Sequence, residues 1–188
     1  HIASMMVRHI AERELEQYLR DRVAPVLGWG TWSFGYKNTE AGHHTPGGGG
    51  IAIRATDMMR TLYMLLHGGQ WGEQQVVPEW YVEHASKASP YNPHYPYSLQ
   101  FTCNSTGLDP ELPEDAYWKA GSGGHAMYVV PSLDMVVWKL GGRDEQFTER
   151  NTGLPEIETG DDREGWEKTV EDGEALRGTL KRVCEAVT

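Results

Sequence analysis

The residues best suited to chemistry lie in one short stretch, residues 119–125, with the sequence KAGSGGH. Lys119 supplies a cation, and a cation on a strand edge stabilises the negative charge that develops when a hydroxyl group attacks an acyl carbon. Gly121 has no Cβ, so a substrate can approach the backbone closely there. His125 has open interpretations: it contacts a substrate or serves as a polar gate, or it is a structural histidine that forms hydrogen bonds within the fold. Together these residue types indicate acyl-group chemistry.

Other suggestive patterns support weaker hypotheses. The segment GSGGHA at residues 121–126 matches a dinucleotide-binding fingerprint, but that motif opens a helix, and here an apolar strand-like run ending at Pro131 follows. The sequence PGGGG at residues 46–50 lacks the Lys-Ser/Thr that a phosphate-binding loop needs. The histidines do not stand at metal-ligand spacing with a third partner. We therefore expect no metal and no cofactor.

The sequence lacks a recognisable nucleophile. It contains no Gly-x-Ser-x-Gly elbow, and none of its serines has a lysine three residues later. Residues 36–38 spell Tyr-x-Asn, a short pattern that arises easily by chance in a loop rich in Gly and Tyr. The groups that would stabilise an acyl transition state are thus present without the group that would start the reaction.

Apolar patterns around this stretch predict an antiparallel sheet. We expect strands at residues 97–103, 116–119, 126–130 and 135–140. The last two are apolar on both faces, which is typical of central strands in a sheet covered on both sides. The sequence PSLD between them favours a tight turn and an antiparallel hairpin. With helices before and after the sheet, the fold class is α+β, an antiparallel sheet flanked by helices.

The beginning of the chain is predicted to be helical from its first residues. Ile2, Met6 and Ile10 stand four residues apart, as on one face of a helix. Pro25 and Gly28 are expected to stop the helical stretch. No N-cap or leader precedes the first turn, which indicates a chain cut from a longer protein.

Further helices are predicted in the middle and at the end of the chain. The segment ATDMMRTLYMLL is the clearest of them, with Thr56 as its N-cap and Gly68 as the left-handed residue beyond its end. A shorter helix is expected to begin at Pro78. The apolar face of the terminal helix consists of Leu176, Leu180, Val183 and Val187.

All 188 residues are assigned to a single domain. Residues 1–95 are expected to be mainly helical with long loops, and residues 96–142 to form antiparallel strands. Residues 143–172 read as an acidic loop, and residues 173–188 as the terminal helix.

Charge and hydropathy exclude several classes of protein. The formal net charge is −10, and the segment Asp144–Glu174 holds twelve acidic against three basic residues. An acidic surface without a basic stripe argues against nucleic-acid binding. The apolar runs are too short to span a bilayer. Cys103 and Cys184 lie far apart and indicate small buried side chains rather than a disulfide framework.

Several motifs, taken in order, resemble the serine β-lactamase-like hydrolases, which include class C β-lactamases, DD-peptidases and related esterases. They are YLRDRVAPVLGWGTW, PGGGGIAIRATDMMRTLYMLLHGGQW, YSLQF and WKAGSGGHAMYVVPSLDMVVWKLGG. The residues that resemble the family's Gly-Gly-x-x-Ser/Thr-x-x-Asp stretch are Gly49, Gly50, Ala55, Thr56 and Asp57. Lys119-Ala120-Gly121 stands where the family has its third active-site motif, some twelve residues before a proline. The resemblance implies the three-layer β-lactamase/transpeptidase-like fold.

The resemblance also implies roles for individual residues. Lys119, Gly121 and Ser122 would be the catalytic residues of this chain, with the Ser122 backbone N–H as one of two oxyanion-hole donors. The substrate pocket would include Ala120, Gly123, Gly124 and His125. Ala120 replaces a hydroxyl residue that helps hold a substrate carboxylate in the family, which favours an esterase or amidase over an enzyme for penicillin-like substrates.

In the family, the Ser-x-x-Lys and Tyr-x-Asn motifs precede the first helix and so would precede His1. The chain therefore resembles only the C-terminal portion of such a hydrolase, with its N-terminal half absent, and by itself is expected to be inactive. Its expected partners are a small-molecule ester or amide and, as one variant, the N-terminal half as a separate chain. The alternative is a non-catalytic binding or sensor protein with the same fold. The cellular compartment is left open.

Overall fold

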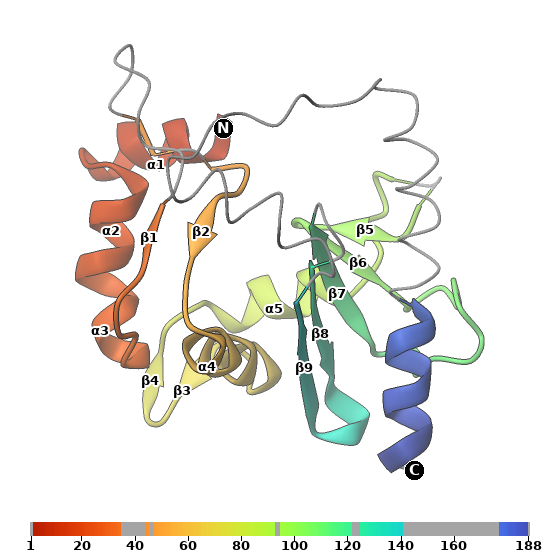
Figure 1. Cartoon of the computed structure of the whole chain (residues 1–188). Coiled ribbons are helices and arrows are strands. Elements are labelled where there is room, and N and C mark those ends of the chain that lie inside the picture. Colours follow the sequence, from red (N-terminus) through yellow and green to blue (C-terminus); the bar gives the residue numbers. More distant parts are fainter. Residues whose placement is uncertain are drawn as a thin grey trace, which may run out of the picture. The chain divides into compact units, whose positions relative to one another are not determined.

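The computed structural model describes residues 2–34, 44–45, 47–92, 95–121, 125–140 and 177–187. These residues belong to two compact units, residues 1–61 and 62–188, and each unit is considered by itself. Figure 1 labels the helices and strands. The expected acidic loop at residues 143–172 lies outside the described residues. Within the described part of the chain, no helix has both the length and the apolar character needed to cross a membrane.

Three helices open the first unit, where the sequence predicted one helical stretch. They are α1 (Ile2–Ala11), α2 (Leu15–Arg22) and α3 (Ala24–Leu27). The chain breaks after α1 because Glu12 adopts a left-handed conformation, with φ of +52°, which a right-handed helix cannot continue. The expectation that Pro25 stops a helix is wrong. Pro25 lies in the first turn of α3, where its missing N–H has no partner to lose. Gly28, with φ of +65°, does end the helical segment.

A short antiparallel ribbon follows in the same unit, formed by β1 (Ser33–Phe34) and β2 (Ile51–Ala52). Its apolar side chains join a small aromatic core. The centre of the Trp32 ring lies 5.5 Å from that of Trp29 and 6.0 Å from that of Phe34, and both pairs have edge-to-face geometry. Such pairs add to the stability that burial alone provides.

The predicted central helix is α4 (Ala55–Leu66). Thr56 is not its N-cap, because the helix begins one residue earlier and Thr56 lies in the first turn. The backbone N–H groups of Asp57 and Met58 instead donate to the carbonyl of Arg54. The C-terminal end is as predicted. Gly68 has φ of +62° and donates to Leu65 O, and the next glycine donates to Met64 O, which is the Schellman pattern.

The second unit continues with a short hairpin and a helix. The hairpin pairs β3 (Gln70–Trp71) with β4 (Gln74–Gln75). The predicted short helix is α5 (Glu79–Ala85), which begins one residue after Pro78, with Pro78 at its N-cap position.

A five-stranded antiparallel sheet forms the centre of this unit. Its strands, in both chain and sheet order, are β5 (Tyr97–Ser98), β6 (Phe101–Cys103), β7 (Tyr117–Gly121), β8 (His125–Val130) and β9 (Met135–Lys139). The single strand predicted for residues 97–103 is wrong. Leu99 and Gln100 both have positive φ, so the chain reverses there and makes a tight hairpin.

The hairpin of β8 and β9 is confirmed, with five directly paired positions. The turn between them is a 3₁₀ segment, Pro131–Leu133, followed by Asp134 with φ of +47°. One expectation about this hairpin is wrong. All residues of β9 are only half-buried, and β9 is the outer strand of the sheet that the described residues form.

One face of the sheet packs against the helix formed by residues 177–187. Trp118 and Tyr128 contribute to this core from the sheet, and Leu180 and Cys184 contribute from the helix. Burial raises the pKa of the Cys184 thiol. Both cysteine side chains are buried and neither is in a disulfide, as the sequence predicted.

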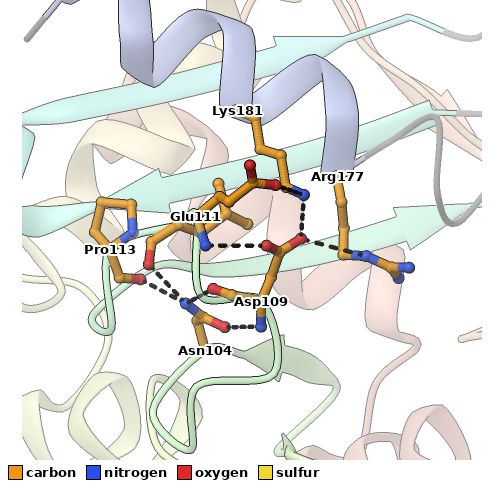
Figure 2. A network of polar contacts seen from close by, with 7 residues as sticks. Asn104, Asp109, Glu111, Pro113, Arg177 and Lys181 are labelled. Atoms are coloured by element: carbon orange, nitrogen blue, oxygen red, sulfur yellow. Dashed lines mark hydrogen bonds and ion pairs between the residues drawn. The ribbon is translucent and has the colours of Figure 1, made fainter.

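Polar contacts fasten the same helix to the loop between β6 and β7 (Figure 2). The fully buried Asn104 amide donates to the carbonyls of three loop residues and accepts from the N–H of Asp109. The Asp109 carboxylate lies 3.1 Å from Lys181 Nζ and 3.7 Å from Arg177 Nε. Asp109 thereby links the loop to the helix that covers the sheet.

Candidate functional site

The candidate stretch spans two neighbouring strands of the sheet. Lys119 and Gly121 lie on β7, and His125 begins β8 directly opposite Gly121. Lys119 is half-buried and is paired with Met127. The expected site residues 122–124, which are Ser122, Gly123 and Gly124, lie outside the described residues. The structure thus places a lysine, a glycine backbone and a histidine within one pair of strands.

The two faces of the sheet separate the expected site residues. Successive side chains of a strand point to opposite faces, and directly paired residues share a face. Lys119 is therefore on the same face as His125, which pairs with Gly121. Ala120 pairs with Ala126 on the other face, where Ala126 belongs to the core beneath residues 177–187. A pocket role for Ala120 remains a prediction.

Sequence reasoning missed Tyr97 as part of this site. The ammonium group of Lys119 donates a hydrogen bond to the Tyr97 hydroxyl oxygen at 3.3 Å and lies 5.7 Å from the centre of the Tyr97 ring. The Tyr97 hydroxyl in turn donates to Gln100 Oε1 at 3.3 Å. The only signal in the sequence was the motif YSLQF, which carries the family resemblance but assigns no role to its tyrosine.

The turn that holds Gln100 has an unusual backbone. Leu99 and Gln100 have φ of +42° and +78°, values that favour glycine, and neither is glycine. The Tyr81 hydroxyl of α5 donates to the carbonyl of Leu99 at 3.1 Å. Burial, with a smaller effect of the nearby Tyr97, raises the pKa of Tyr81, so its hydroxyl keeps its proton and remains a donor. The surrounding structure stabilises a strained turn beside the lysine, and strained backbone tends to occur at functional sites.

The arrangement provides a fixed positive charge next to an accessible backbone. A protonated lysine can stabilise an oxyanion or bind a carboxylate, and its hydrogen bond to Tyr97 limits where the charge can lie. Gly121 is exposed, and among the described residues a Cβ built at this position would come no closer than 3.8 Å, to His125. The geometry therefore fits binding of an acyl group or another anionic centre at the end of β7.

A second polar cluster joins a serine, a histidine and a glutamate in the first unit. Ser4 Oγ lies 3.0 Å from His44 Nε2, and His44 Nδ1 lies 3.0 Å from Glu14 Oε2. These distances match those of a catalytic triad, which the sequence did not indicate because the three residues are far apart. Ser4 is only 1% exposed, however, and Gly47 packs directly on it. The cluster fits a structural role that fixes the segment at residue 44 to α1 and α2.

Metal ligation has no support in the described part of the chain, where no three His, Cys, Asp or Glu side chains gather as potential ligands. The expectation of a protein without a metal rests on the sequence alone.

Comparisons with known proteins identify the fold. No family model and no curated protein matches the chain. A solved structure of a "putative beta-lactamase" from Bacteroides dorei DSM 17855 is similar over 81% of this chain and 55% of its own length, with a TM-score of 0.57 and 19% identity. Simvastatin synthase (LovD) from Aspergillus terreus is similar over 72% of this chain and 45% of its own, with a TM-score of 0.52 and 16% identity. A second structure of that protein, its selenomethionyl derivative, is similar to this chain with a TM-score of 0.55 and 14% identity.

The described elements therefore form part of a β-lactamase-like fold, and the predicted α+β class is confirmed. At these identities the likeness shows the fold and leaves the activity open. The chain spans about half the length of the solved structures that it matches.

Proposed function

We propose that this chain is the C-terminal part of a serine β-lactamase-like hydrolase that acts on a small ester or amide through an acyl-serine intermediate. The observation that carries the proposal is the Lys119 ammonium group, held by Tyr97 on a strand that ends in the exposed Gly121. The fold shared with the "putative beta-lactamase" and with simvastatin synthase supports it. The nucleophilic serine would lie outside residues 1–188.

The proposed reaction assigns this chain an electrostatic role. A serine hydroxyl on the remaining part of the fold attacks the acyl carbon and passes its proton to a base on that part. Lys119 and the Ser122 N–H stabilise the oxyanion that forms. The leaving alcohol or amine takes up the proton, and water then releases the acyl group from the serine. Gly123, Gly124 and His125 would border the substrate, with Ala120 as a further pocket residue.

The alternative is a non-catalytic binding or sensor protein that keeps this fold without a functional nucleophile. It would use the same lysine to hold an anionic ligand, so Lys119 alone does not distinguish the two. The presence of a reactive serine distinguishes the hydrolase from the sensor.

Turnover of a fluorogenic short-chain ester tests the proposal. The complete gene product should hydrolyse the ester, and the 188-residue chain alone should not. Replacing Lys119 by Met should lower kcat/KM by about 100-fold or more, since an oxyanion-stabilising group is lost. The matched control is Lys87→Met, which removes an exposed lysine that forms an ion pair with the exposed Glu83 of α5 and should leave turnover unchanged. Turnover by the chain alone would contradict the proposal, and no turnover by the gene product would favour the sensor.

A further inference from the structure

Helix α1 packs in the reverse of the usual amphipathic manner. A surface helix normally turns its large apolar side chains toward its own core. In α1 the one buried residue is Ser4, whereas Ile2, Met5, Met6 and Ile10 are 78%, 59%, 57% and 76% exposed. The side of the helix that carries the small Ser4 thus faces inward, and the side with the large apolar residues faces outward.

The four exposed side chains form one continuous face. At 100° per residue, they fall within an arc of about 140°, with the exposed His9 between them. We call Ile2, Met5, Met6 and Ile10 the α1 apolar face. Contiguous exposed apolar patches are typical of interaction sites, whereas singly scattered apolar residues are normal on a protein surface.

Contacts on the inner side fix the orientation of α1. The Ser4 hydroxyl is hydrogen-bonded to His44, and a Cβ built on Gly47 would come within 2.8 Å of Ser4 Cβ. Because only glycine fits against Ser4, the inner side is closely packed. Rotating the helix to bury its apolar face would break these contacts, so only further polypeptide could cover that face.

We propose that the α1 apolar face binds the remaining part of the β-lactamase-like fold, which supplies the nucleophilic serine. This inference rests on the proposed function. The matched structures are about twice as long as the part that this chain covers, so a complete fold contains as much polypeptide again to serve as the occupant. Two of the four side chains are methionines, which are flexible and common at interfaces.

A second copy of the chain fits this surface less well. A helix of ten residues is about 15 Å long, and one such face is small beside the roughly 800 Å² per partner of a standard interface. The α1 apolar face is better suited to be one part of a larger contact within a fold.

Site-specific cross-linking tests the proposal in the complete gene product. A photoreactive p-benzoylphenylalanine replaces Met6, and the cross-linked peptide is identified by mass spectrometry. The expected partner is a polypeptide encoded before His1, in the same chain or as a separate one. The control places the same group at Val187, which is 59% exposed on the terminal helix and should not give this cross-link. A cross-link from Met6 to a second copy of α1, to residues 1–188 of the same chain, or none above the control, would overturn the proposal.

A paired variant keeps the result separate from the hydrolase proposal. The double variant Met6→Glu, Ile10→Glu should weaken the binding of α1 to the polypeptide encoded before His1 at least 10-fold, whereas Val187→Glu should not. The unfolding midpoint of the 188-residue chain alone should stay unchanged in the double variant. If the cross-link forms but no serine in the assembly reacts with a fluorophosphonate, the docking surface stands and the hydrolase proposal fails. If a serine outside this chain reacts but Met6 does not cross-link to its segment, the docking surface fails and the hydrolase proposal stands.

Discussion

The ammonium group of Lys119 donates to the hydroxyl of Tyr97 at 3.3 Å, although the strands that carry these residues are not neighbours in the sheet. Strand β6 lies between β5 and β7 (Figure 1). The hydrogen bond shows that the two long side chains reach across it. Tyr97 is thereby a positioning residue for the cation on which the proposed chemistry depends.

Replacing Tyr97 by Phe should free the lysine. The variant keeps the ring and removes the hydrogen-bond acceptor, so the Lys119 amine should react faster with an acetylating reagent. The free energy of unfolding should fall by only about 0.5–1.5 kcal/mol, because the lost hydrogen bond is partly exposed. Quantitative mass spectrometry of the acetylated peptides measures the rate, with Lys87 as the internal reference. An unchanged ratio of the two rates would show that Tyr97 does not restrain Lys119.

Replacing Gln100 by Gly should raise the free energy of unfolding by about 0.5 kcal/mol, because relief of the left-handed backbone outweighs the exposed hydrogen bond from Tyr97 that the variant loses. The φ of +78° at this position is the reason. The matched control is Gln74→Gly on strand β4, an exposed position with ordinary backbone, which should lower stability by about 0.5–1 kcal/mol. Urea denaturation gives both values. A loss of stability in both variants would mean that the turn is not strained.

Replacing Asn104 by Ala should be among the most damaging single changes in the second unit. The fully buried amide satisfies three carbonyls and one N–H of the loop that Asp109 joins to the terminal helix (Figure 2). Leaving these buried groups without partners should cost about 2–4 kcal/mol. The comparison is Asn92→Ala, where the backbone N–H forms the local turn, and it should cost far less. Equal losses in urea denaturation would rule out the network as a major contributor.

Acid should weaken the first unit through Glu14. Burial acts to raise the pKa of this carboxyl, but hydrogen bonds from Thr45 N–H and His44 and the charge of Arg8 overcome it, so its pKa lies below 4.5. A depressed pKa stabilises the folded state above the unfolded value, and this contribution is lost as the pH falls through the folded value. The stability difference between wild type and Glu14→Gln should therefore be full at about pH 6 and shrink below pH 4.5. A stability difference for Glu14→Gln that stays constant across this pH range would contradict the assignment.

The sequence predicted the elements whose signals are local. The apolar runs of β8 and β9, the glycine that ends α4 and the position of Lys119 on a strand all follow from short patterns, and the structure confirms them. The errors arose where a single backbone conformation decides the path of the chain. Glu12 breaks the first helix, and the turn at residues 99–100 divides a predicted strand, although none of these residues is typical of a left-handed conformation.

Contacts between distant residues could not be predicted at all. Tyr97 and Lys119 are 22 positions apart, and Ser4 and His44 are 40 apart. Each pair meets only because several elements between them pack in a particular way, and that packing has no signature in a short pattern of residues.

Mapping the serine that reacts with a fluorophosphonate probe tests the central claim most directly. The account predicts that the complete gene product is labelled on a serine encoded before His1, and that the 188-residue chain by itself is not labelled. Labelling of any serine within residues 1–188, including the buried Ser4, would contradict it. So would a complete gene product that carries no reactive serine.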